Sequence, residues 1–94
     1  MADLTLALNG EYFDAIRDGS KTEEYRLRTD YWNKRLVCRS YDWIVLTRGY
    51  PSREDASRRL VLPWRGYVTK ALTHPHFGPD EVQVFAIDVS GQPQ

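Results

Sequence analysis

Residues 9–28, NGEYFDAIRDGSKTEEYRLR, contain a helix start, a helix end and a change of periodicity within one short segment. Asn9 is a favoured N-cap residue, because its side-chain oxygen can accept a hydrogen bond from an amide of the first helical turn. Apolar side chains then recur three and four residues apart, at Tyr12, Phe13 and Ile16. Gly19 stands where a left-handed C-cap is expected. These signals predict a short helix with one apolar face that ends at a glycine.

The periodicity changes after the glycine. Tyr25 and Leu27 alternate with charged residues, as in a half-buried strand with one apolar face. Lys21, Glu24 and Arg26 bring both signs of charge to the junction between helix and strand. One interpretation is a solvated cluster of ion pairs, since exposed pairs are common and weak. The other is a charged cleft.

The spacing of this junction resembles a known family signature. Residues 19–26 match the pattern Gly-x-Lys-x-x-Glu-x-Arg of the ASCH family (activating signal cointegrator homology domains). Residues 11–28 are similar to the opening helix and second strand of that family, and residues 81–89, EVQVFAIDV, to its final strand. The likeness covers nearly the whole chain. It therefore implies a small stand-alone ASCH domain of the bacterial or phage type, with a PUA-like β-barrel fold.

Composition limits the alternatives. Ninety-four residues allow one domain, and equal numbers of basic and acidic residues give no net charge. Zero net charge counts against a large non-specific nucleic-acid footprint. Cys38 is the only cysteine, which excludes an internal disulfide and a multi-cysteine zinc site. Residues 1–10 lack the basic and apolar regions of a signal peptide, and no run is long enough to cross a bilayer. We therefore expect a cytoplasmic protein.

The charges are unevenly distributed along the chain. Residues 48–70 contain six basic residues and two acids, whereas residues 71–94 contain three acids and no lysine or arginine. A local basic face on a neutral protein suits a small anionic ligand or a short single strand better than a long duplex. The alternative interpretation is that these arginines are scattered over the surface and form no basic face.

The remaining segments predict mostly strands. Thr29 and Asp30 are a second capping signal, before one or two helical turns. Strands are expected at residues 4–8, 41–47, 58–63, 66–72 and 81–89, and loops at 51–57 and 73–80, before a flexible tail at 90–94. The 41–47 and 81–89 strands should be buried. The expected fold is a single α+β domain over residues 1–94: a small PUA-like β-barrel of five or six strands with one or two short helices.

The resemblance implies a cleft for RNA or a nucleotide between the helix–strand junction and the barrel. By its motif, the cleft would be lined by Lys21, Glu24 and Arg26. Lysine and arginine can hold a phosphate or carbonyl oxygen, the arginine bidentately. Glu24 could accept a hydrogen bond from a base amino group or act as a general base. Alternatively, Glu24 and Arg26 neutralise each other and only hold the cleft wall in place.

Two further segments pair an aromatic residue with an arginine at a glycine turn, namely residues 47–50 (TRGY) and 64–67 (WRGY). Such pairs can stack bases and hold phosphates in a single-stranded site. The candidate ligand contacts are Arg48, Tyr50, Arg65 and Tyr67. Packing in the core explains the aromatic residues equally well.

Both histidines fall in the 73–80 loop, separated by one proline. In an extended segment they would diverge, and no third ligand stands nearby, so we expect neither a metal nor a cofactor. His76 at the mouth of the cleft could act on a phosphodiester.

Three function classes remain. The first, which we favour, is a domain that binds single-stranded RNA or a nucleotide. The second is a ribonuclease, the favoured chemistry, with Lys21 and Glu24 as catalytic candidates. The third class is an amidohydrolase of N4-acetylcytidine-type nucleosides, as in another branch of the family. That branch has a threonine nucleophile where this chain has Glu24, although Lys21 matches its activating lysine. The departure at Glu24 argues against this mechanism.

Overall fold

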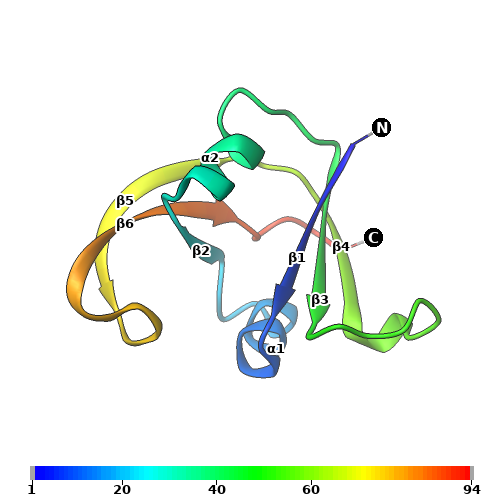
Figure 1. Ribbon diagram of the computed structural model, residues 1–94. Helices are drawn as coiled ribbons and strands as arrows, with labels where there is room; N and C mark the ends of the chain where they lie inside the picture. Colours follow the sequence, from blue (N-terminus) through cyan, green and yellow to red (C-terminus); the bar gives the residue numbers. More distant parts are fainter. Residues whose placement is uncertain (1, 94) are drawn as a thin grey trace.

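Two three-stranded sheets and two helices make up the computed structural model, which describes residues 2–93 (Figure 1). The elements are β1 (Asp3–Leu8), α1 (Gly10–Asp18), β2 (Glu23–Leu27), α2 (Asp30–Leu36), β3 (Trp43–Arg48), β4 (Arg59–Pro63), β5 (Tyr67–His74) and β6 (Gly78–Asp88). Two short 3₁₀ turns, η1 (Ala56–Arg58) and η2 (Pro75–Phe77), precede β4 and β6.

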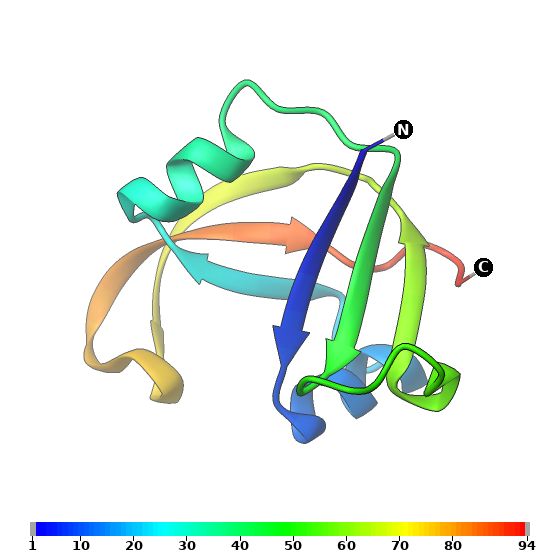
Figure 2. The same ribbon diagram turned by 45° about the vertical axis from the view of Figure 1, so that its right-hand side comes forward.

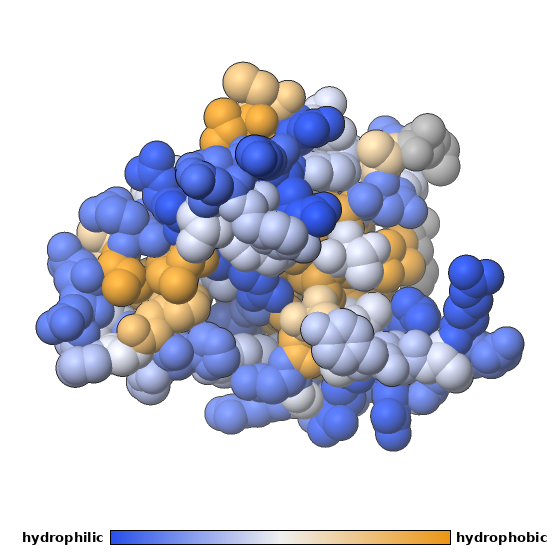
Figure 3. Space-filling view, viewed as in Figure 1, coloured by the Kyte–Doolittle hydropathy of each residue, from blue (hydrophilic) through white to orange (hydrophobic). Residues whose placement is uncertain are grey.

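The first sheet has the strand order β1-β3-β4, and the second has the order β2-β6-β5. β1 pairs with β3 in parallel, and the other neighbouring strands are antiparallel. Figures 1 and 2 show the second sheet curving away from the first, with α1 and α2 at opposite ends of the gap between them. On the same face, Figure 3 shows a recess between the sheets with hydrophilic residues in it.

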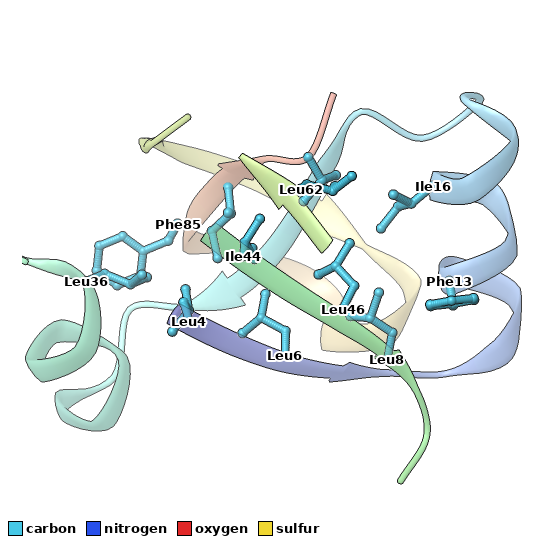
Figure 4. Close-up of a cluster of buried hydrophobic side chains, with 12 residues drawn as sticks. Leu4, Leu6, Leu8, Phe13, Ile16, Leu36, Ile44, Leu46, Leu62 and Phe85 are labelled. Atoms are coloured by element: carbon cyan, nitrogen blue, oxygen red, sulfur yellow. The ribbon is translucent and has the colours of Figure 1, made fainter. Parts of the chain in front are cut away.

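The core fills the space between the sheets and is closed by the helices (Figure 4). Every second residue of β1 is buried, as expected for a strand with one face against the core. Phe13 and Ile16 of α1 cover one end of this core, and Leu36 of α2 lies near Phe85 of β6 at the other. Both helices are therefore anchored by apolar side chains.

Local signals predict the helix ends correctly. The Asn9 side chain accepts a hydrogen bond from the Tyr12 amide at 2.9 Å, and Gly19 ends α1 with a φ of 89°. The Thr29 hydroxyl accepts one from the Trp32 amide at 3.3 Å, at the start of α2. Capping residues thus mark both ends of α1 and the start of α2.

The small α+β class is confirmed. The expected barrel is not, because within residues 2–93 the two sheets share no strand pairing that would close one. β3 and β6 are the central strands of their sheets, as expected for the two buried segments. No helix of the described chain is long and apolar enough to span a membrane. The tail expected at 90–94 includes residue 94, which lies outside the described residues.

The prediction of a long loop over residues 73–80 was wrong. β5 continues to His74, and β6 already begins at Gly78, which pairs with His74 across the hairpin. Pro75 starts the η2 turn between them, and Gly78 leaves it with a φ of 97°. The prolines and the glycine therefore build a tight hairpin connection instead of interrupting the strands.

Candidate functional site

β2 turns two of its three charged residues, Glu24 and Arg26, toward the inside of the fold. Glu24 lies opposite Ile87 of β6 and Arg26 lies opposite Phe85, and residues directly opposite in an antiparallel pair project to the same face. Ile87 and Phe85 belong to the core, and Glu24 itself is only 4% exposed.

The expectation that the apolar residues of this strand form its buried face was therefore wrong. Tyr25 and Leu27 lie opposite Ala86 and Val84, on the other face of the second sheet. β6 is apolar on both faces, so the pairing register decides which set of β2 faces the gap between the sheets. The charges can occupy the inner face because they neutralise one another there.

Glu24 lies between two cations. Its Oε2 accepts a hydrogen bond from Arg26 Nη1 at 2.6 Å, and its Oε1 is 3.5 Å from Lys21 Nζ. Arg26 also donates from Nη1 to the Tyr25 carbonyl at 2.9 Å and from Nη2 to the Ala7 carbonyl at 3.2 Å. The arginine therefore links β2 to β1, and the three side chains together carry one positive charge.

Aromatic rings surround the lysine. Lys21 Nζ lies 5.1 Å from the centroid of the Tyr12 ring and 4.8 Å from that of Tyr25, within the range of cation–π contacts. The Tyr25 hydroxyl donates to Glu23, which also binds Lys70 Nζ at 2.7 Å. Burial, and then this hydrogen bond to the Glu23 carboxylate, raise the pKa of Tyr25 above its ordinary value. Tyr25 is thus held as a neutral wall beside Lys21.

Both histidines also line the pocket, in contact with the tyrosine rings. The His74 ring packs against Tyr12 and Tyr25, at centroid distances of 5.9 and 5.8 Å, and the His76 ring lies 6.2 Å from Tyr12. The His76 amide donates to His74 Nδ1 at 3.1 Å, so a neutral His74 carries its proton on Nε2. The expected divergence of the histidines was wrong, because η2 is a 3₁₀ turn that brings both to one cavity.

These side chains line a cavity of about 240 Å³, here called the signature pocket, whose characteristic residues are Tyr12, Lys21, Glu24, Tyr25, Arg26 and His76. It is smaller than the pockets of roughly 300–1,000 Å³ that hold drug-sized ligands. Its size therefore suits a small ligand. No cluster of three or more metal-ligating side chains occurs among residues 2–93.

Four of the candidate residues meet in this pocket, namely Lys21, Glu24, Arg26 and His76. Tyr50, 96% exposed, lines an adjoining hollow. Arg48 instead pairs with Asp14 of α1, with its Nε 3.4 Å from the carboxylate. It lines neither cavity.

The two remaining candidates lie elsewhere. Arg65 Nε is 3.2 Å from Asp88, and Tyr67 packs edge-on against Phe85 at a centroid distance of 5.1 Å. Both line a shallow hollow that shares no residue with the signature pocket. The resemblance of the two glycine turns in sequence therefore does not bring them to one site.

Sequence reasoning missed the aromatic walls. The sequence pattern places Tyr12 on the apolar face of α1 and Tyr25 on the buried face of β2. A signal was available, because both are tyrosines, which commonly have one apolar side and one polar contact when they line a site. His74 and Phe77 reach the pocket only through the tight η2 turn, which the prolines alone did not reveal.

In comparisons with known proteins, no family model, no curated sequence and no solved structure gives a significant match to this chain.

Proposed function

We propose that this chain is an ASCH-like domain with a PUA-like architecture that binds single-stranded RNA or a nucleotide in the cytoplasm. The observation that carries the proposal is the buried carboxylate of Glu24, held between Lys21 and Arg26 on the floor of an aromatic-walled pocket. A buried ion cluster contributes little net stability compared with apolar side chains of similar volume. Its position in an open pocket therefore supports a role toward a ligand.

The pocket offers each contact that an unstacked nucleotide requires. Tyr12 and Tyr25 present ring surface on which a base can stack, a contact worth about 1–3 kcal/mol per base. Lys21 provides a positive charge for a phosphate. Glu24 Oε1, 3.5 Å from Lys21, retains lone pairs for the amino group of a base.

Ribonuclease activity is the chemistry that we propose for this site. In that reaction a base removes the proton of a ribose 2′-hydroxyl, the oxygen attacks phosphorus, and an acid protonates the departing 5′-oxygen. Both oxygens of Glu24 already face cations, so its proposed role is to position Lys21. Within residues 2–93 no hydrogen bond engages the ring nitrogens of His76, which makes it the proposed proton carrier.

No contact in the pocket favours the amidohydrolase. The residue at the position of the threonine nucleophile is Glu24, whose carboxylate is held by two cations. The buried hydroxyl of Thr47 donates to the Gly49 carbonyl and does not line the signature pocket. Release of acetate from N4-acetylcytidine is therefore retained only as an outcome of the test.

The test is binding and cleavage of a short single-stranded RNA of mixed sequence at low salt. We expect wild type to bind, and Lys21→Ala to weaken binding at least about tenfold, since a charge-assisted contact is lost. The matched control is Lys34→Ala on the exposed surface of α2, which removes the same charge and should bind as wild type does.

Cleavage by wild type and Lys34→Ala, but not by His76→Ala, would support the ribonuclease. RNA that stays intact while bound would leave a recognition domain. An equal effect of the two lysine substitutions would overturn the site, and absence of binding by wild type would overturn the function. If wild type then released acetate from N4-acetylcytidine, the protein would instead be assigned amidohydrolase activity.

A further inference from the structure

A second hollow adjoins the signature pocket. We call it the outer pocket; it has a volume of about 460 Å³ and lies between β1, the start of α2 and the turn after β3. Its characteristic residues are Arg26, Tyr31, Trp32, Tyr50 and Arg59. Ala7 and Arg26 line both pockets, so the two cavities meet at these residues.

Arg26 is fixed at this boundary. Its guanidinium carbon lies 5.4 Å from the centroid of the Trp32 ring, on the side of the outer pocket, while its Nη1 binds Glu24 in the signature pocket. A guanidinium group has five N–H donors. Contacts with Glu24, Tyr25 and Ala7 use three of these within the described residues, which leaves Nε–H and one Nη2–H for a ligand.

The charged side chains that line the outer pocket are all basic. Two arginines line it, and no aspartate or glutamate does. Arg59 is held in place by hydrogen bonds from its Nη2 to the carbonyls of Pro51 and Ser52, at 3.3 and 3.1 Å. Both guanidinium groups are thus held in place, Arg59 by backbone carbonyls and Arg26 by Glu24, and each can donate hydrogen bonds to a phosphodiester.

Aromatic surface is also available in the outer pocket. Tyr50 is 96% exposed and Tyr31 is 56% exposed, and Tyr31 packs edge-on against Trp32 at a centroid distance of 5.0 Å. A single exposed tyrosine is unremarkable on a soluble domain. Three aromatic residues beside two fixed guanidinium groups are the combination on which single-stranded nucleic acids stack.

We infer that the outer pocket is the subsite for a second, adjacent nucleotide, so that the domain recognises two successive nucleotides of a single strand. One base occupies the signature pocket, Arg26 contacts the phosphate that links the two nucleotides, and the next base stacks in the outer pocket beside Trp32 and Tyr50. This inference rests on the proposed function, because it extends the same binding site.

The experiment compares a nucleoside 3′-monophosphate with the dinucleotide that carries one further nucleotide, each with 2′-O-methyl ribose so that neither can be cleaved. Affinities are measured by calorimetry for all four bases. Wild type should bind the dinucleotide at least about fivefold more tightly than the mononucleotide, the lower end of the gain from one stacked base. Tyr50→Ala should remove that gain and leave the affinity for the mononucleotide unchanged.

Tyr50 is suited to this test because its exposed side chain can be removed without opening the core. Arg59→Ala should likewise weaken only the dinucleotide. Arg53→Ala, in the same loop but outside the outer pocket, is the charge-matched control and should have no effect.

The outcomes separate the inference from the proposed function. Equal affinities for the two ligands, or an equal loss for both ligands in Tyr50→Ala, would overturn the second subsite. If mononucleotide binding then still depended on Lys21, the proposed function would stand. Absence of binding of either ligand by wild type would overturn both.

Discussion

Glu24 Oε2 lies 2.6 Å from Arg26 Nη1, and both side chains leave β2 on the face that points toward the core. Two residues of one strand thus form an ion pair at the edge of an apolar interior. Lys21 adds a second cation to the same carboxylate at 3.5 Å. Removing the carboxylate would leave two largely buried cations facing each other.

Glu24→Gln should therefore lower the free energy of unfolding by about 2 kcal/mol, less than a fully buried pair would lose, because Lys21 and Arg26 keep some exposure. Urea denaturation measures the change. The matched control is Glu23→Gln on the same strand, whose pair with Lys70 is more exposed and should contribute less than about 1 kcal/mol. A larger loss in the control would contradict this account of β2.

Replacing the pair together should separate stability from binding. In Glu24→Leu/Arg26→Met, only the Lys21 charge loses its partner, so we expect the free energy of unfolding to fall by less than the roughly 2 kcal/mol lost in Glu24→Gln. RNA binding should nevertheless fall at least about tenfold, since a charge-assisted contact with Arg26 is lost. A double variant that binds RNA normally would assign the ion pair to architecture alone.

The raised pKa of Tyr25 should affect how the free energy of unfolding changes at alkaline pH. Its pKa is raised in the folded state above the ordinary value of 10.0, so the neutral form is favoured by folding. The unfolded chain then loses this proton first, and the stability linked to Tyr25 declines as the pH rises above about 10, through the folded pKa. In Tyr25→Phe, which keeps the ring but has no hydroxyl to titrate, the free energy of unfolding should fall less steeply between pH 9 and about 11. Parallel curves for the two proteins would refute the linkage.

The backbone conformation of Gly78 helps to hold His74 and His76 at the signature pocket. Its φ of 97° and ψ of −171° lie in a region that is essentially restricted to glycine. Gly78→Ala should therefore lower the free energy of unfolding by about 1–3 kcal/mol and displace His76 from the signature pocket. Thermal denaturation and RNA cleavage measure the two effects. Asp80→Ala, an exposed site two residues further on, is the control and should change stability by less than about 0.5 kcal/mol.

The helices and central strands could be predicted because their signals are local. Asn9, Gly19 and Thr29 act on the backbone within a few residues, and the apolar runs of β3 and β6 need no partner to be recognised. The inner face of β2 could not be predicted in this way. Whether the Glu24 side chain faces the core depends on the register of β2 with β6, a strand that lies far along the sequence.

The candidate site was predictable to a similar extent. The spacing of Lys21, Glu24 and Arg26 identified three residues that do meet. In sequence, Arg65 and Arg48 also look like ligand contacts, because each stands beside an aromatic residue at a glycine turn. In the fold, each is paired with an aspartate from another element. Such pairings arise only from the tertiary fold, so local motifs could not distinguish them from members of the site.

The parallel pairing of β1 with β3 has a consequence for the order in which the molecule can assemble. Among the strands of residues 2–93, β1 pairs with β3 alone, and α1, β2 and α2 all lie between them along the chain. During synthesis β1 must therefore wait until α1, β2, α2 and then β3 have been made before it can enter a sheet. Closing so long a loop is slow compared with forming a hairpin. The first sheet can thus be completed before the β5–β6 hairpin is made, whereas the signature pocket is complete only when β6 pairs with β2 and the hairpin supplies His74 and His76.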